Sequence, residues 1–176
     1  NISLHELETQ FGLQRNFEDQ FFSEWQGNLP NITDLEKTLL EKYNFCQRFL
    51  QKADLLEGDA TAIKALKNSC LYYLASLEQH EILVSQQFGE SDNMTDSLAA
   101  LNCSAKFNLV GFADQMQKFE TQWHDTTLVM DKWFSLSASL ANDEIFNHLN
   151  QLEKHKLFTL KNPNRARSLI GAFAMQ

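Results

Sequence analysis

Proline and glycine are scarce in this sequence, and their scarcity argues against a strand-rich fold. Only two prolines and six glycines occur among the 176 residues. Strand-rich folds use both residues in their many turns, whereas helices tolerate neither of them well in their interior. Leu, Ala, Glu, Gln and Lys, which favour helix or tolerate it well, are plentiful. The composition therefore predicts an all-α protein.

Cysteine is too rare and too widely spaced for a disulfide framework or a structural zinc site. The three cysteines are Cys46, Cys70 and Cys103, and no two of them form a CxxC pair. Each lies among apolar residues at helical spacing, which is typical of buried thiols in a reducing compartment. We therefore expect a cytoplasmic protein.

Long apolar runs and basic clusters are also missing. No stretch of about 18 apolar residues occurs, so no membrane-spanning helix is expected. The formal net charge is −8, and an acidic chain repels phosphate backbones. Lys161, Arg165 and Arg167 form the densest basic group, which is too short for a nucleic-acid footprint. We expect neither a membrane nor a nucleic acid as a partner.

Motifs for common kinds of catalysis do not occur. A zincin helix needs two histidines four residues apart with a glutamate as general base. His5-Glu6 is followed by Thr9 at the second position, and His80-Glu81 by Val84. No nucleophile elbow, phosphate-binding loop or dinucleotide fingerprint is present. We predict no catalytic residue and no metal site; an unrelated helical enzyme with an unrecognised site is an alternative.

Apolar residues at helical spacing fill most of the chain. Gly89 is expected to end a helix that runs from about Gln79 to Phe88. Short connections predict antiparallel helix pairs, stacked as an irregular α-solenoid of the armadillo or HEAT type, with about eight or nine helices in one domain covering 1–176. Helix starts are predicted where capping residues occur, at Ser3–Glu6, Thr33–Glu36, Asn142 and Asn162–Pro163.

The last third of the chain carries two distinctive strings. They are DKWF at 131–134 and NPNRARSLIGAF at 162–173. Together with shorter strings upstream, in order from about Ile63, they resemble the C-terminal helical domain of bacterial aminopeptidase N, a family of M1 zinc metallopeptidases. A string of this length at a fixed distance from DKWF is hard to obtain by chance.

The resemblance implies a parent enzyme that uses zinc to remove N-terminal residues from peptides. In that family an HExxH motif with a distant glutamate holds the zinc, and a GxMEN motif holds the amino end of the substrate. Neither motif occurs here, so the chain is expected to be inactive alone. The helical domain of the family covers the catalytic domain and encloses the chamber through which peptides arrive. The resemblance also implies that the domain continues past Gln176.

The turn from Asn162 to Arg167 is the best candidate for a functional site. The resemblance places it toward the chamber, where Asn164, Arg165 and Arg167 would line the peptide route. The structural alternative is that both arginines bind carbonyls of adjacent helices and hold the stack together. In DKWF, we expect the Trp and Phe to lie in the core and Asp131 to pair with a nearby Arg or Lys.

A second hypothesis is a free-standing helical module derived from the same domain. Its concave face would bind a peptide or a partner helix, without peptidase activity.

Overall fold

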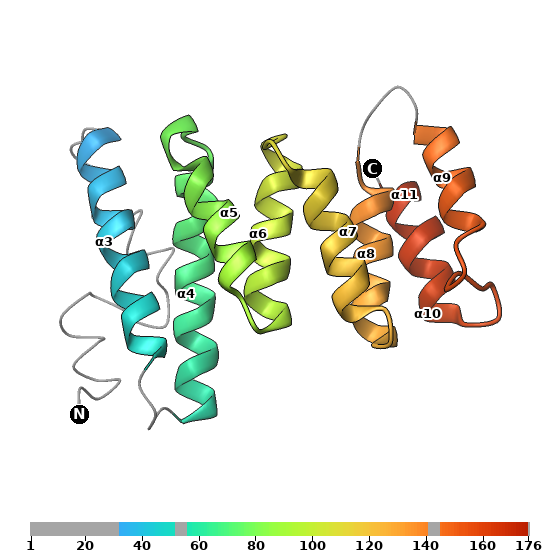
Figure 1. Ribbon diagram of the computed structural model, residues 1–176, viewed down its shortest axis with the longest axis horizontal. Helices are drawn as coiled ribbons and strands as arrows, with labels where there is room; N and C mark the ends of the chain where they lie inside the picture. Colours follow the sequence, from blue (N-terminus) through green and yellow to red (C-terminus); the bar gives the residue numbers. More distant parts are fainter. Residues whose placement is uncertain (1–31, 52–55, 141–144, 176) are drawn as a thin grey trace. The chain divides into compact units, whose positions relative to one another are not determined.

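The computed structural model of the chain describes residues 32–51, 56–140 and 145–175. Its helices carry the labels of Figure 1. The chain divides into two compact units, residues 1–74 and residues 75–176. The helix starts predicted at Ser3–Glu6 and at Asn142 lie outside the described residues.

The first unit is described from helix α3 (Ile32–Leu50) onward and includes nearly all of α4 (Glu57–Ala75). Cys46 and Phe49 of α3 are buried together with Ile63 of α4. Beside this cluster Lys67 is buried, and its ammonium group donates a hydrogen bond of 3.1 Å to the side-chain carbonyl of Gln47. The two helices are therefore joined by an apolar interface and one side-chain hydrogen bond. Helix α3 begins at Ile32, so Thr33 lies inside the helix and not at the predicted capping position.

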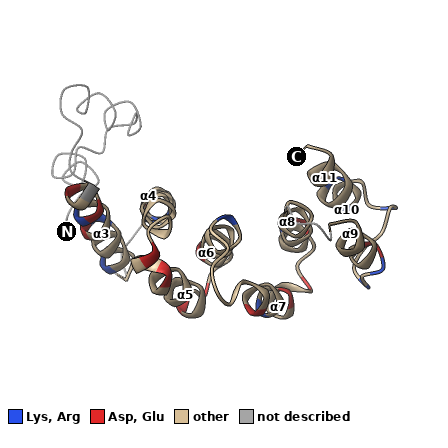
Figure 2. Ribbon diagram, turned by 90° about the horizontal axis from the view of Figure 1, so that it is seen from above, with Lys and Arg blue, Asp and Glu red and all other residues tan. Residues whose placement is uncertain are grey.

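In the second unit the helices form two layers. In Figure 2, α6, α8 and the pair α10–α11 lie in one layer, and α5, α7 and α9 lie in the other. Each helix from α5 to α8 contacts the next one along the chain. The bounds are η1 (Glu78–His80), α5 (Glu81–Glu90), α6 (Met94–Lys106), α7 (Phe112–Trp123), α8 (Thr127–Ala138), α9 (Ile145–Glu153), α10 (Pro163–Ala166), η2 (Arg167–Gly171) and α11 (Ala172–Ala174).

The predicted all-α class and the stacking of consecutive helices are confirmed. No strand occurs in the parts of the chain that the structure describes. The short connections hold neighbouring helices against each other, as expected for helices whose apolar faces each need a partner.

The core of the second unit is continuous across its two layers. Phe119 of α7 and Phe134 of α8 are fully buried. Replacing a buried ring of this kind with Ala costs about 3–5 kcal/mol. The buried members of this core are Leu101, Met116, Phe119, Val129, Met130, Trp133, Phe134, Ala138, Leu152 and Leu169.

The turn between α6 and α7 uses two residues with positive φ. Asn108 has φ 51° and Gly111 has φ 89°. Asparagine and glycine tolerate this conformation better than other residues. The turn at residues 108–111 therefore separates α6 from α7, and Gly111 is the N-cap of α7.

The helix end predicted at Phe88, before Gly89, is wrong by two residues. Gly89 lies inside α5, which continues to Glu90. The backbone N–H of Ser91 donates to the carbonyl of Gln87 at 3.1 Å, and its hydroxyl donates to the same oxygen at 2.5 Å. Because Ser91 satisfies this carbonyl, the helix ends without a left-handed glycine.

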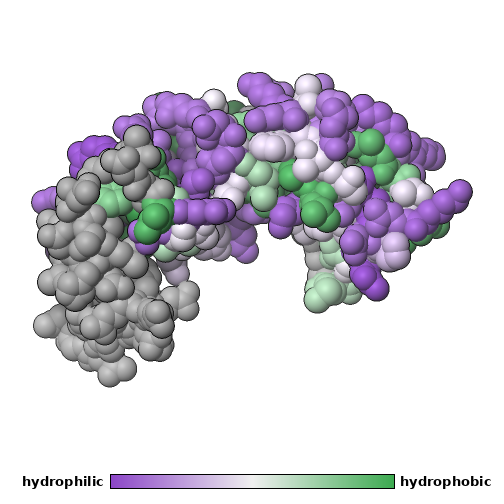
Figure 3. All heavy atoms as spheres, turned by 90° about the horizontal axis from the view of Figure 1, so that it is seen from below, coloured by the Kyte–Doolittle hydropathy of each residue, from purple (hydrophilic) through white to green (hydrophobic). Residues whose placement is uncertain are grey.

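One face of the second unit is mostly hydrophilic. The face drawn in Figure 3 shows only small hydrophobic patches among hydrophilic side chains. Isolated apolar side chains of this kind are ordinary on a globular surface. Within the described residues, no helix is both long enough and apolar enough to cross a membrane.

Candidate functional site

The predicted site residues lie at the start of α10. Asn162 is the N-cap, and its side-chain oxygen accepts hydrogen bonds from the N–H groups of Asn164 at 3.0 Å and Arg165 at 3.3 Å. Pro163 follows at the first helical position, where its missing N–H costs nothing. This local chemistry fixes the directions in which the next side chains leave the helix.

Arg165 points into the protein. Its side chain is only 5% exposed. Its Nε donates to Oδ1 of Asp131, Nη1 donates to the carbonyl of Leu157 at 2.5 Å, and Nη2 donates to the carbonyl of Thr127 at 3.1 Å. The guanidinium carbon also lies 4.9 Å from the ring centre of Phe134. Each of the three guanidinium nitrogens therefore donates a hydrogen bond to another residue of the chain.

These contacts support the structural alternative for Arg165. A planar guanidinium can donate to a carboxylate and to carbonyls at the same time. A lysine ammonium lacks this geometry. Arg165 joins the first turns of α8 to the connection between α9 and α10. The expected pairing of Asp131 with an arginine or lysine is also present.

Trp133 and Phe134 lie in the core, as the sequence indicated. The indole N–H of Trp133 donates to the carbonyl of Met116 on α7 at 3.1 Å. The two rings meet edge to face, 5.1 Å apart. Lys132, between Asp131 and these rings, is exposed on the surface of α8.

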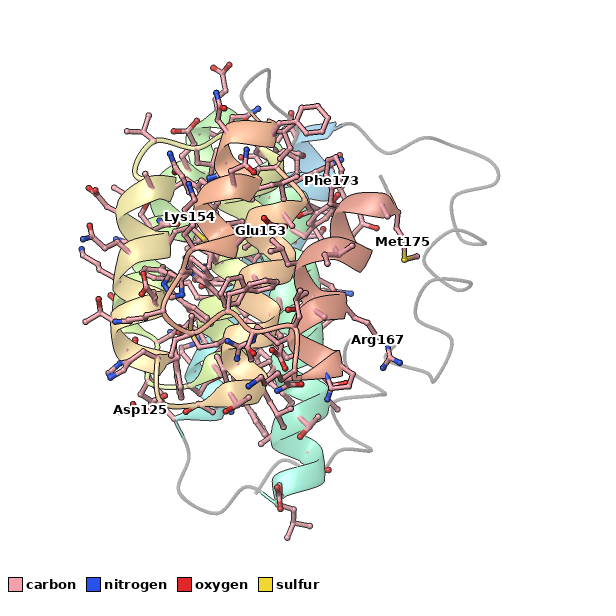
Figure 4. All side chains as sticks on the ribbon, turned by 90° about the vertical axis from the view of Figure 1, so that its right-hand side faces the viewer. Asp125, Glu153, Lys154, Arg167, Phe173 and Met175 are labelled. Atoms are coloured by element: carbon pink, nitrogen blue, oxygen red, sulfur yellow. The ribbon has the colours of Figure 1, made fainter. Side chains whose placement is uncertain are left out.

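Asn164 and Arg167 are exposed and point away from the core. Arg167 makes no hydrogen bond or ion pair with any other described side chain. Figure 4 shows it extending away from the helices, while Asp125 lies on the opposite side of the unit. Residues three apart on a helix share a face, so Arg167 lies near Asn164.

The turn η2 contains a π-helical widening. The N–H of Ala172 bonds to the carbonyl of Arg167, five residues earlier. The extra residue rotates everything after it around the helix relative to a regular α-helix. Nothing in the sequence pattern signalled this feature.

An open groove of about 750 Å³ lies over α8 in the second unit. Of the predicted site residues, Asn164 lines this groove, and Arg165 and Arg167 do not. Arg167 lies about one helical turn after Asn164. Sequence reasoning missed Lys132 and Asn102 as site residues, because an exposed lysine or asparagine on a helix resembles any solvated residue. The lining residues are Leu98 and Asn102 of α6, Leu128, Asp131, Lys132, Ser135, Leu136 and Ser139 on or just after α8, Asn164 of α10 and Ala172 of α11.

The cysteine thiols offer no nucleophile. Burial raises the pKa of Cys46 and Cys103 to about 11 and that of Cys70 to about 12. A thiol with so high a pKa carries little thiolate at neutral pH.

The histidines and carboxylates offer no metal site where the structure describes them. His155 contacts Glu120 at 3.0 Å, with the ring packed 5.4 Å from that of Trp133. No group of three or more His, Cys, Asp or Glu side chains that could hold a metal ion occurs in the described ranges. These residues therefore do not fit the zinc that the resemblance assigns to a parent enzyme.

Comparison with known families finds one matching description. A family described as "Domain of unknown function (DUF3458_C) ARM repeats" matches residues 32–176. The match covers all the helices described above.

Named relatives are bacterial aminopeptidases. Aminopeptidase N of Escherichia coli (strain K12) is 42% identical over 144 residues, which are 81% of this chain and 16% of that protein. Aminopeptidase N of Haemophilus influenzae is 40% identical over 113 residues, which are 64% of this chain and 13% of that protein. The chain thus spans less than a fifth of either relative.

A solved structure shares the fold. The crystal structure of Legionella pneumophila aminopeptidase A in complex with aspartic acid superposes with a TM-score of 0.64 and 24% identity. The match covers 98% of this chain and 21% of that one. At this identity the likeness concerns the fold alone.

Proposed function

Because the chain belongs to the DUF3458_C family of ARM-repeat domains, we propose that it is the non-catalytic helical domain of a zinc-dependent aminopeptidase that removes N-terminal residues from peptides. The observation that carries this proposal is the 42% identity to Escherichia coli aminopeptidase N over 81% of the chain. Since the chain spans only 16% of that relative, the chemistry would belong to the remainder of the protein.

The partner in this proposal is the catalytic domain of the same enzyme. That domain would supply the zinc, because HExxH is absent from this sequence and no metal cluster occurs among the described residues. Both units would form one helical domain with further helices after Gln176. The parent enzyme would act in the cytoplasm, as the buried, unpaired thiols suggest.

The role of this domain would be to enclose the chamber through which peptides reach the zinc. The groove over α8 provides an open face with polar side chains, and Asn164 lies on it. Arg167 is exposed beside it and is free to meet a substrate carboxylate or carbonyl. Arg165 would act indirectly, by holding α10 against α8.

The experiment uses the full-length protein that contains this chain. We expect Arg167→Ala to lower kcat/KM for peptides of several residues by roughly threefold to tenfold, the size of one lost charge-assisted contact. Hydrolysis of a single amino-acid amide should be unchanged, because it is too short to reach this domain. Lys118→Ala, on exposed α7 surface outside the groove, is the matched control.

Melting temperature separates a functional role from a structural one. The Arg167→Ala protein should melt as the wild type does. If Arg167→Ala lowered the melting temperature and lowered turnover of both substrates alike, Arg167 would have a structural role and not a role in peptide binding.

The groove also supports the second candidate, a free-standing peptide-binding module without peptidase activity. Sequencing the gene on both sides of this segment distinguishes the two. An HExxH motif upstream in the same reading frame supports the aminopeptidase domain, and an immediate start and stop codon support the module.

A further inference from the structure

The groove over α8 has unequal ends. On α8, Lys132 lies toward the N-terminal end of the lining, and Ser135 and Ser139 follow toward the other end. The serine hydroxyls already donate to helix carbonyls, at 3.0 Å to Asp131 and 2.9 Å to Leu136. One end of the groove therefore carries an exposed positive charge, and the other end is neutral.

The positive charge at this end is not cancelled within the described part of the chain. Asp131 is the acidic residue in the lining, and Arg165 already donates to it. Lys132 forms no ion pair or hydrogen bond with another described residue. Arg167 adds a second free cation one turn beyond Asn164. On a chain with net charge −8, this local excess of positive charge favours an anionic ligand.

The dimensions and lining of the groove suit a short peptide. From Lys132 to Ser139 a helix rises about 10 Å, which is roughly three residues of extended chain. A volume of about 750 Å³ is in the range of small-ligand sites. Asn102 and Asn164 flank the groove with amide groups that both donate and accept hydrogen bonds, as main-chain recognition requires.

We propose that this groove binds the C-terminal end of a short peptide, with the terminal carboxylate at Lys132. One cationic end followed by neutral amides, hydroxyls and apolar side chains matches a main chain that carries a single terminal charge. Recognition of acidic side chains would need cations at successive positions, and the far end has none in its lining. The proposal rests on the proposed function for the source of the peptide, which would be a substrate of the parent enzyme.

The test is a titration of the purified chain, followed by amide chemical shifts at low ionic strength. The three probes are N-acetyl-penta-alanine with a free carboxylate, the same peptide as its C-terminal amide, and N-acetyl-Ala-Ala-Glu-Ala-Ala as an amide. We expect the free acid to bind roughly threefold to tenfold more tightly than either amide, with saturable shifts in α6, α8 and α10.

Two variants locate the contact. Lys132→Gln should remove the preference for the free acid, and Lys118→Gln on α7 should keep it. Both lysines are exposed, so both variants should fold, and an unchanged spectrum outside the substituted helix confirms this.

Several results would overturn the proposal. If the free-acid peptide and its amide bound equally tightly, or if neither gave saturable shifts up to about 10 mM peptide, the groove would not be a carboxylate site. If the two lysine variants changed the preference for the free acid equally, Lys132 would not bind the carboxylate. If the Glu-containing amide bound as tightly as the free acid, the groove would recognise an acidic side chain and not a terminal carboxylate. Because the chain is tested alone, these outcomes are independent of whether the full-length protein processes peptides.

Discussion

At the scale of single residues, Arg165 joins segments that are distant in the sequence. Its guanidinium binds Asp131 and Thr127 on α8 and Leu157 in the connection before α10. Removing one partner of a buried ion pair leaves the other charge without compensation. We expect Arg165→Ala to lower the free energy of unfolding by about 3–5 kcal/mol.

Urea unfolding measures this loss, and Arg167→Ala is the matched control. Since Arg167 is exposed and makes no hydrogen bond or ion pair with another described side chain, its loss should change stability by less than about 0.5 kcal/mol. In the double variant with Asp131→Ala, the combined loss should be smaller than the sum of the two single losses. Similar losses for the two arginine variants would contradict the structural role of Arg165.

The buried thiols make stability depend on pH. Burial raises the pKa of Cys70 from its ordinary value of 9.0 to about 12. A raised pKa means that the folded chain keeps a proton which the unfolded chain releases above pH 9. The stabilisation is therefore complete below pH 9 and is lost as the pH rises toward 12.

We expect the free energy of unfolding to fall between pH 8 and about pH 10.5, and to fall less steeply in Cys70→Ala than in the wild type. Urea unfolding at a series of pH values measures both slopes. Identical slopes would show that Cys70 ionises equally easily in both states.

Some of these residue roles were predictable from the sequence, and others depend on tertiary contacts. The core positions of Trp133 and Phe134 follow from their residue type. A pairing of Asp131 with a cation could be expected, but its partner Arg165 lies 34 residues away in the chain. The carbonyl partners of Arg165 lie 8 and 38 residues away in the chain. No sequence period relates them, so only the packed helices reveal which arginine points inward.

At the scale of elements, the start of α10 rests on one side chain. Asn162 accepts hydrogen bonds from two backbone N–H groups that have no other helical partner. We expect Asn162→Ala to cost about 1 kcal/mol of unfolding free energy. Thermal or urea unfolding measures it.

Asn150→Ala is the control for this substitution. Asn150 is exposed in α9, where alanine is the better helix former, so this variant should be neutral or slightly stabilising. If both asparagine variants behaved alike, the cap would have no measurable role.

The elements also show where local signals suffice. Asn162-Pro163 predicted the start of α10, because both residues act through their own side chain and backbone conformation. The exact end of α5 depended on a serine that binds a carbonyl four residues earlier. The π-helical turn lies against α8, and no local sequence pattern predicted it.

At the scale of the whole molecule, the groove is a product of three helices. Its walls come from α6, α8 and α10–α11, whose lining residues are far apart in the sequence. The sequence located Asn164 through a family resemblance, but it gave no sign that Asn102 and Lys132 share the same surface. Helix stacking brings them together, and stacking geometry is set by side-chain volumes rather than by spacing.

The proposed function makes a prediction about assembly. If the chain is the helical domain of an aminopeptidase, the chain and the remainder of the full-length protein, produced as two polypeptides, should associate. Obligate interfaces of this kind bury more than about 2,000 Å², so we expect a one-to-one complex that survives size-exclusion chromatography. The chain alone should hydrolyse no amino-acid amide, because the motifs for zinc and for the substrate's amino end are absent from its sequence. Turnover of an amide by the chain alone would instead mean that it holds a catalytic site of its own, and failure to associate would favour the free-standing module.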